Sequence, residues 1–158
     1  MRLGVLDVGS NTVHLVAVDA ATGGRPTPMS DWKTPLRLVE QLDKDGNIHE
    51  KGLKKLISAV AEANELGQKL GCHEFIAFAT SAVRSAPNSE YVLDQVEKQT
   101  GVRLEILSGE EEARLTFLAV RRWYGWSAGR ITNLDIGGGS LELSTGTDEH
   151  PDLAFSLD

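Results

Sequence analysis

The chain has 158 residues, of which 41% are hydrophobic and 25% charged, and this composition is typical of one soluble globular domain. The net charge of −7 argues against a general nucleic-acid surface, and no apolar stretch is long enough to span a membrane. Cys72 is the only cysteine, which excludes an intrachain disulfide and a cysteine metal cluster. We therefore expect a cytoplasmic protein without nucleic-acid or membrane partners.

The first part of the chain predicts an antiparallel sheet. Apolar residues alternate over 2–9 and 12–20, which predicts a β-hairpin around a turn that contains Gly9. Ala21–Pro28 predicts a turn, and a third strand is expected within Trp32–Leu42.

Two helices have clear patterns. In residues 50–70 apolar side chains recur at intervals of three and four, and Gly71 follows where a C-terminal cap belongs. The helix at 110–124 begins with three glutamates, which the helix dipole favours in a first turn. A shorter helix, capped by Asn88 or by the residue after it, is expected to end near residue 99.

The remaining elements complete an α/β layered pattern. Short buried strands are expected at Phe75–Ala79 and Val102–Leu107, and a strand, a turn and a second strand over Asn133–Ser144. Three arginines of the second long helix are expected at the surface or at an interface, and the aromatic cluster after them is expected to pack rather than to stack a base. These residues are Arg114, Arg121, Arg122, Trp123, Tyr124 and Trp126.

Two glycine-rich turns share one pattern. The first is Asp7-Val-Gly-Ser-Asn-Thr12 and the second, 128 positions later (135 minus 7), is Asp135-Ile-Gly-Gly-Gly-Ser140. In each, an aspartate ends an apolar run, and glycine lets backbone N–H groups approach a ligand, which suits phosphate. The alternative interpretation is a pair of structural hairpin turns. The candidate phosphate-binding residues of the turns are Gly9, Ser10, Asn11, Gly137, Gly138, Gly139 and Ser140.

Two further features fit phosphate chemistry. Asp7 and Asp135 stand at strand ends, where a carboxylate can hold a divalent cation or its waters, although such carboxylates also cap nearby amides. Arg84 follows a buried strand and a turn of small residues, from which a guanidinium can bind phosphate oxygens, with the hydroxyl of Ser81 assisting. The alternative for Arg84 is a solvated surface position.

Four motifs occur in the order Asp7-Val-Gly-Ser-Asn, Thr80-Ser-Ala-Val-Arg84, Ser108-Gly-Glu-Glu-Glu-Ala113, and Asp135-Ile-Gly-Gly-Gly-Ser140 with Glu142. Together they resemble the exopolyphosphatase/guanosine pentaphosphate phosphohydrolase (Ppx/GppA) family. The resemblance implies a ribonuclease-H-like half-domain of the actin and sugar-kinase superfamily, with a mixed five-stranded sheet flanked by helices. Family proteins are longer, so we expect residues 1–158 to be the N-terminal phosphate-binding domain of a two-domain protein, without its C-terminal domain.

The resemblance also implies a reaction, the hydrolysis of the terminal phosphate of inorganic polyphosphate, guanosine pentaphosphate (pppGpp) or both. One glutamate of the triplet would take a proton from the attacking water, and the family motif assigns this role to Glu112, with Glu111 as the alternative. Mg²⁺, or another divalent cation such as Mn²⁺, would bind at Asp7 and Asp135, with Glu142 joining through water. We expect the isolated domain to be weakly active or inactive.

Two other functions stay open. An actin-like ATPase or sugar kinase would share the phosphate turns, but those relatives do not carry the glutamate triplet and the Thr80–Arg84 segment in this form. A non-catalytic domain that senses phosphate or acts as a scaffold would bind phosphate chains without turnover. An apolar face is expected where the second domain would dock, and it would favour self-association, for example as a homodimer. At His14 the family often has a larger basic or apolar residue, so the sequence assigns His14 no role in substrate choice.

Overall fold

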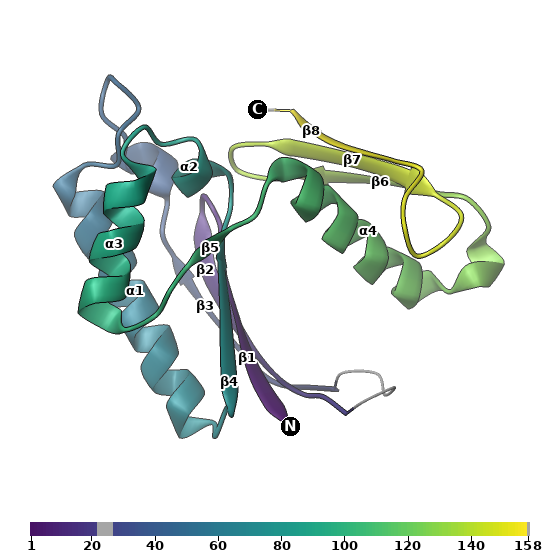
Figure 1. Cartoon of the computed structure of the whole chain (residues 1–158), viewed down its shortest axis with the longest axis horizontal. Coiled ribbons are helices and arrows are strands. Elements are labelled where there is room, and N and C mark those ends of the chain that lie inside the picture. The colour runs from purple at the N-terminus through teal and green to yellow at the C-terminus, as the bar shows by residue number, and fades with distance from the viewer. Residues whose placement is uncertain (22–26, 158) are drawn as a thin grey trace. The chain divides into compact units, whose positions relative to one another are not determined.

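The fold is that of a computed structural model, which describes residues 1–21 and 27–157 (Figure 1). The chain forms two compact units, Met1–Ile106 (unit 1) and Leu107–Asp158 (unit 2). The turn predicted at Ala21–Pro28 lies largely outside the described residues. Every helix of the described ranges is too short or too polar to cross a membrane.

Unit 1 is built on a mixed five-stranded sheet, which confirms the predicted fold class. Its strands are β1 (Arg2–Val8), β2 (Thr12–Asp19), β3 (Thr27–Pro35), β4 (Glu74–Ala79) and β5 (Glu105–Ile106), in the order β3-β2-β1-β4-β5. The other elements are η1 (Leu38–Gln41), α1 (Glu50–Lys69), α2 (Ser81–Arg84) and α3 (Ser89–Thr100). Strands β1, β2 and β3 pair antiparallel, whereas β4 runs parallel to β1 and β5 parallel to β4. The parallel pairing needs a crossover, which α1 supplies.

One face of this sheet carries the core of unit 1. Because side chains alternate along a strand, Leu6 and Val8 of β1 lie on the same face as Val13 and Leu15 of β2, and all four are at most 1% exposed. They belong to one hydrophobic cluster with the apolar stripe of α1, including the fully buried Leu56. Figure 1 shows α1 and α3 side by side on this face.

Helix α1 lies close to the sheet because glycines stand at the contact. Gly67 of α1 and Gly4 of β1 both face the ring of Phe75, and a Cβ at either position would lie 2.8 or 2.7 Å from a ring carbon. The helix ends as predicted, since Gly71 takes the left-handed conformation with φ 72°.

Two strand predictions for unit 1 need correction. The third strand begins at Thr27 rather than near Trp32, and residues 38–41 form η1 instead of extending it. Of Val102–Leu107 only β5 is a strand. Val102 and Leu104 are buried without being part of the ladder to β4, so their alternation reflects packing against the core rather than strand pairing.

Asn88 occupies the N-cap position of α3, as one of the two predicted alternatives. Its side chain makes no cap hydrogen bond. Instead it accepts from the backbone N–H of Ile48 and donates to the carbonyl of the same residue, both at 2.9 Å. Asn88 therefore ties the start of α3 to the segment before α1.

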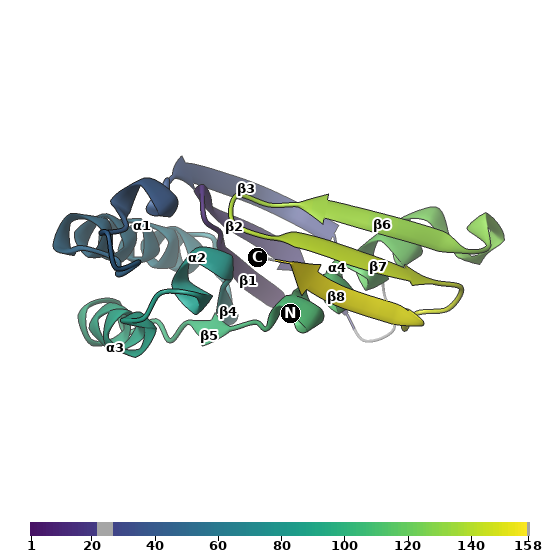
Figure 2. The same cartoon turned by 90° about the horizontal axis from the view of Figure 1, so that it is seen from above.

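Unit 2 is a three-stranded antiparallel sheet with one long helix on one face. Its elements are α4 (Gly109–Tyr124), η2 (Trp126–Ala128), β6 (Ile131–Ile136), β7 (Leu141–Gly146) and β8 (Leu153–Leu157), and the strand order is β6-β7-β8. Helix α4 packs against all three strands, and Figure 2 looks onto the sheet face that is turned away from α4. Strand β8 was not predicted from the sequence.

Arg121 is fully buried within unit 2, so its predicted place at the surface or at an interface is wrong. Its guanidinium donates to the backbone carbonyls of Gly125, Gly129 and Gly146, at 3.3, 2.7 and 2.9 Å, and lies 5.7 Å from the centre of the Phe117 ring. Three chain segments are thus held together at one end of unit 2 by a single side chain. The other two arginines are exposed, as expected.

The aromatic cluster also differs from the prediction. Trp123, Tyr124 and Trp126 are 72%, 66% and 56% exposed, so they do not pack into the core of unit 2. The indole of Trp126 donates to Asp148 at 3.4 Å. Helix α4 is amphipathic, and the face that buries Phe117 does not include Trp123 or Tyr124 in its last turn. The η2 segment that follows has no buried residue.

Candidate functional site

The two glycine-rich turns have the same backbone geometry. Each is closed by one hydrogen bond of 2.9 Å, from Gly9 N–H to the Thr12 carbonyl in unit 1 and from Gly137 N–H to the Ser140 carbonyl in unit 2. A Cβ would lie 3.3 Å from the Thr12 oxygen or 3.2 Å from the Ser140 oxygen, which is tighter than nine in ten real Cβ contacts, so the neighbouring backbone would have to shift by a few tenths of an ångström. The close approach of the backbone therefore favours glycine at the same place in both turns.

The glycine-rich turn of unit 1 is held by backbone hydrogen bonds from the segment that follows β3. The Ser10 carbonyl accepts from Leu38 N–H, and the Asn11 carbonyl accepts from the N–H groups of Leu36 and Arg37. A trans peptide directs its N–H opposite to its carbonyl, so the amides that follow Ser10 and Asn11 point away from residues 36–38. Such a set of oriented amides is suited to an anion.

The end of β4 brings a second group of predicted residues to this turn. Because β4 pairs parallel with β1, both strands end at the same edge of the sheet, and the Thr80 N–H donates to the Val8 carbonyl at 3.1 Å. The hydroxyls of Ser10 and Ser81, both buried, are 2.7 Å apart. Half-buried Arg84 follows in the last turn of α2. Unit 1 thus brings together the turn, Ser81 and the helix that carries Arg84.

Asp7 is exposed at the end of β1, directly opposite His14 of β2, which in turn pairs with Lys33 of β3. Burial of the imidazole, followed by the positive charge of Lys33, lowers the pKa of His14 below its usual value, although Asp31, 3.8 Å away, and Asp7 act in the opposite direction. His14 is therefore neutral near pH 7, and the charges nearest to it on this face are Asp7, Asp31 and Lys33.

In unit 2 two carboxylates face each other beside the second turn. Asp135 of β6 pairs with Glu142 of β7, and both lie on the face of the sheet that α4 covers. The hydroxyl of Thr116 on α4 is 3.4 Å from the Asp135 carboxylate. Glu142 is only 1% exposed and accepts a hydrogen bond of 2.8 Å from Ser156 of β8. Sequence analysis missed Thr116 and Ser156 as neighbours of these carboxylates.

The three glutamates in the first turn of α4 have different surroundings. Glu110 pairs with Arg114 one turn later. Glu111 accepts hydrogen bonds from the hydroxyl and the N–H of Ser108, at 2.7 and 2.8 Å, which completes a capping box and lowers the pKa of Glu111. Glu112 precedes Thr116 by four residues and so shares its face of the helix, toward Asp135.

The predicted cation ligands fit a magnesium-type ion in part. Over residues 1–21 and 27–157, no three His, Cys, Asp or Glu side chains are grouped closely enough to hold a metal ion. Asp135 and Glu142 nevertheless supply two carboxylates from paired strand positions. Mg²⁺ is typically held by one or two carboxylates and keeps several waters, so this pair matches its usual donor set. Asp7 belongs to unit 1.

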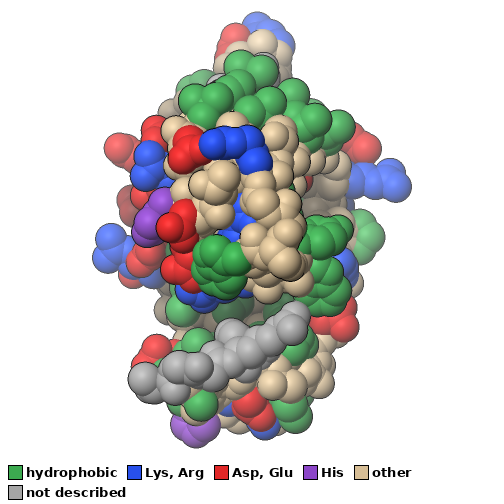
Figure 3. Space-filling view, turned by 90° about the vertical axis from the view of Figure 1, so that its right-hand side faces the viewer, with side chains coloured by type: hydrophobic (Ala, Val, Ile, Leu, Met, Phe, Trp, Pro, Cys, Tyr) green, Lys and Arg blue, Asp and Glu red, His purple; other side chains and the backbone are tan. Residues whose placement is uncertain are grey.

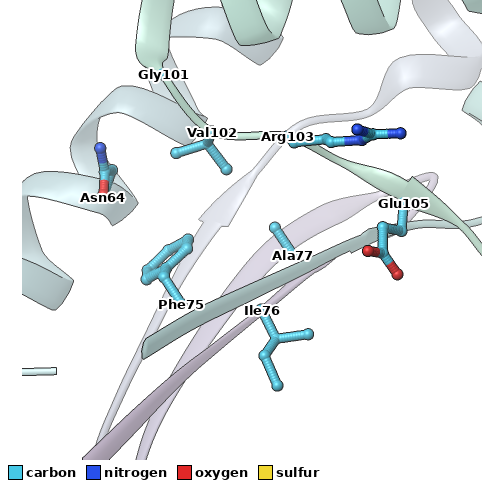
Figure 4. Close-up of a pocket in the computed structure, with 8 residues that line it drawn as sticks. All are labelled: Asn64, Phe75, Ile76, Ala77, Gly101, Val102, Arg103 and Glu105. Carbon is cyan, nitrogen blue, oxygen red and sulfur yellow. The ribbon is translucent and has the colours of Figure 1, made fainter. Parts of the chain in front are cut away.

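A separate pocket lies beside β4 and is not formed by the predicted site residues. It has a volume of about 310 Å³ and is lined by Asn64, Phe75, Ile76, Ala77, Gly101, Val102, Arg103 and Glu105. Figure 4 shows the Phe75 ring and the Val102 side chain on one side and the Arg103 guanidinium on the other. The pocket forms where the segment before β5 leaves the edge of β4.

The fold places the chain in the actin-like structural class. It is similar to MreB5 of Spiroplasma citri, with a TM-score of 0.53 and 16% identity, which is a likeness of fold alone. Residues 16–158 match the model of the Ppx/GppA phosphatase family, and the chain belongs to this family.

Proteins of the Ppx/GppA family are more similar to this chain than MreB5 is. The chain is 65% identical over 157 residues to exopolyphosphatase 1 of Mycobacterium tuberculosis, covering 99% of this chain and 46% of that protein. Among solved structures, an exopolyphosphatase from Cytophaga hutchinsonii has a TM-score of 0.91 at 28% identity, and the Aquifex aeolicus Ppx/GppA member has 0.84 at 26%. The comparison covers 99% of this chain in both cases, and 50% and 51% of those chains. The chain therefore spans about half the length of the relatives that it matches.

Proposed function

We propose that residues 1–158 are the N-terminal phosphate-binding part of a longer cytoplasmic exopolyphosphatase, which removes the terminal phosphate of inorganic polyphosphate. The observation that carries the proposal is the pair of turns with the same closing hydrogen bond and a tightly packed glycine at the same place, one in each unit. Each turn also follows an aspartate in the second-last position of its strand, a combination that a structural hairpin does not need. The family membership and the name of the mycobacterial relatives support the same reaction.

In this proposal the backbone amides of each glycine-rich turn bind phosphate oxygens of the polyphosphate chain. Ser10, Asn11 and Thr12 in unit 1 and Gly137–Ser140 in unit 2 supply donors without bulky side chains, and Arg84 adds a charged donor. Fixed donors of this kind stabilise the charge that develops on the transferred phosphoryl group without reorganisation.

Glu112 is the proposed general base. The oxygen of a water molecule attacks the terminal phosphorus, and the water proton passes to the Glu112 carboxylate. The bond from that phosphorus to the bridging oxygen breaks, and this oxygen keeps the electron pair as the new end of the shortened chain while orthophosphate is released. Glu111 is the less suitable group because two hydrogen bonds from Ser108 stabilise its carboxylate and lower its pKa. A divalent cation, Mg²⁺ or Mn²⁺, held by Asp135 and Glu142, would neutralise phosphate charge.

We propose polyphosphate as the substrate, with pppGpp as the alternative. An aromatic surface is one way to bind a guanine base, and the exposed aromatic residues of unit 2 follow the end of α4. Tyr124 lies about 12 Å further along the helix axis than Thr116, the residue that contacts Asp135. Figure 1 shows the β6–β7 turn at the other end of α4, near its first residue.

The test is phosphate release by the full-length protein with Mg²⁺, using long-chain polyphosphate and pppGpp in parallel. We expect release from polyphosphate and a loss of at least ~10²-fold in Glu112→Gln, as for a lost general base. Glu110→Gln is the matched control, since it alters a neighbouring carboxylate that pairs with Arg114 on the helix surface, and it should keep the rate.

Other results would change the assignment. If Glu112→Gln keeps its full rate while Glu111→Gln loses it, the base is Glu111. If the full-length protein binds polyphosphate but releases phosphate from neither substrate, the chain is a phosphate sensor rather than a hydrolase.

A further inference from the structure

Unit 2 separates its side chains between the two faces of its sheet. The residues of β6, β7 and β8 that share a face with Asp135 and Glu142 are mostly polar, whereas those of the opposite face are mostly apolar. In Figure 3 hydrophobic side chains gather toward the top of the view, over the three-stranded sheet. The polar face is the one that α4 covers, through the contact of Thr116 with Asp135. Polar groups covered in this way need hydrogen-bond partners or a ligand.

Three side chains form one row across the polar face. Asp135 of β6 is paired with Glu142 of β7, and Glu142 is paired in turn with Ser156 of β8. Directly paired residues have their Cβ atoms about 4.5–5.5 Å apart, so each side chain of the row can reach the next. The Ser156 hydroxyl donates to Oε1 of Glu142 at 2.8 Å. Because β7 is the central strand, Ser156 contacts Glu142 from the side opposite to Asp135.

The burial of Glu142 makes this contact important. Glu142 is only 1% exposed, and a charged carboxylate removed from water needs hydrogen bonds or a cation to stabilise it. A carboxylate has two oxygens, and the Ser156 hydroxyl occupies only Oε1. Fixing Oε1 also fixes the plane of the carboxylate, and with it the position of Oε2.

Asp135 has a weaker contact of the same kind. The Thr116 hydroxyl of α4 is 3.4 Å from Oδ2 of Asp135, which is long for a hydrogen bond between two oxygens. Each carboxylate of the pair therefore has one oxygen beside a hydroxyl from a third element, and the shorter bond is the one to Glu142. Ser156 is thus the stronger of the two orienting groups.

We propose that Ser156 is a positioning residue of the cation site, which orients Glu142 so that Glu142 and Asp135 bind one divalent cation together. The inference rests on the proposed function, which assigns Mg²⁺ or Mn²⁺ to these two carboxylates. Hydrogen-bond partners of metal ligands fix the orientation of those ligands, and their loss typically costs about 10–100-fold in metal affinity. Without the Ser156 hydroxyl the Glu142 carboxylate can rotate, and ordering it again opposes cation binding.

The test is direct binding of Mn²⁺ to the full-length protein, measured from the electron paramagnetic resonance signal of the free ion. Ser156→Ala removes the hydroxyl, and Ser156→Thr keeps it. Ser144→Ala is the matched control, because Ser144 is fully buried on the same face of β7, two residues from Glu142. Within residues 1–21 and 27–157 the Ser144 hydroxyl has no hydrogen-bond partner, so its removal breaks no contact to a carboxylate.

We expect Ser156→Ala to bind Mn²⁺ on the order of tenfold more weakly, and Ser156→Thr and Ser144→Ala to bind it as the wild type does. In phosphate release, Ser156→Ala should need about tenfold more Mg²⁺ for its half-maximal rate and reach a rate near that of the wild type at saturating Mg²⁺. A residue that only stabilised the fold would lower the rate at every Mg²⁺ concentration.

Equal Mn²⁺ binding by Ser156→Ala and the wild type would overturn the inference and leave the proposed function intact. A loss of the same size in Ser144→Ala would also overturn it, because removal of any buried hydroxyl would then weaken binding. A wild-type protein that binds no Mn²⁺ would refute the cation of the proposed function as well, so the two failures can be told apart.

Discussion

Arg121 offers the sharpest test of how unit 2 is held together. Replacing it with methionine keeps an unbranched chain of similar length but removes the donors to the Gly125, Gly129 and Gly146 carbonyls. A hydrogen bond from a charged donor contributes about 1.5–3 kcal/mol, and a buried acceptor left without a partner adds a penalty. Two of the three bonds are shorter than 3.0 Å. We therefore expect Arg121→Met to lower the free energy of unfolding of unit 2 by about 3–5 kcal/mol.

Arg122→Met is the matched control. The neighbouring Arg122 pairs with Glu149 at 3.0 Å on the surface, where an ion pair is worth under about 1 kcal/mol. The assay is native-state hydrogen exchange of β6–β8 amides, read separately from those of β1–β4 because the chain has two compact units. A loss in Arg121→Met no larger than in Arg122→Met would refute the structural role assigned to the buried guanidinium.

Two further predictions concern the turn and the cap of unit 2. Gly137→Ala puts a Cβ 3.2 Å from the Ser140 carbonyl oxygen, so the backbone of the turn must shift by a few tenths of an ångström. Calorimetric titration of the full-length protein with polyphosphate should then show binding weakened on the order of tenfold. Thr132→Ala, on the sheet face turned away from α4, should bind normally. Ser108 lowers the pKa of Glu111 below its usual 4.5, so unit 2 should lose stability as the pH falls through the lowered pKa. Ser108→Ala should flatten this pH dependence in acid unfolding curves. An unchanged curve would contradict the capping box.

The sequence located the motif-bearing elements well because their signals are local. Glycine after an aspartate at the end of an apolar run predicts a turn from neighbouring residues alone, and both turns lie where expected. The helix cap is also readable, since Ser108 followed three residues later by Glu111 is a capping-box pattern. That pattern assigns Glu111 to the cap and so favours Glu112 as the base.

The features that sequence reasoning missed depend on contacts between distant segments. Arg121 is buried because carbonyls from η2 and β7 converge on it, and nothing in the helix sequence indicates those acceptors. Val102 and Leu104 alternate as a strand would, yet they are buried without ladder partners. Asn88 is of a residue type that commonly caps helices, but its side chain forms hydrogen bonds with the backbone of Ile48 instead.

The sheet of unit 2 also has a consequence for the order in which the chain acquires structure. Strands β6, β7 and β8 are consecutive, so their pairings join residues that are near in sequence, whereas β1 must wait for β4, where Leu3 pairs with Glu74. Pairings near in sequence form sooner. We therefore expect the leucines on the sheet face turned away from α4 to gather into one surface before the pairing of β1 with β4 completes unit 1. Apolar surface that is exposed during folding favours aggregation, so refolding yield should fall as the chain concentration rises.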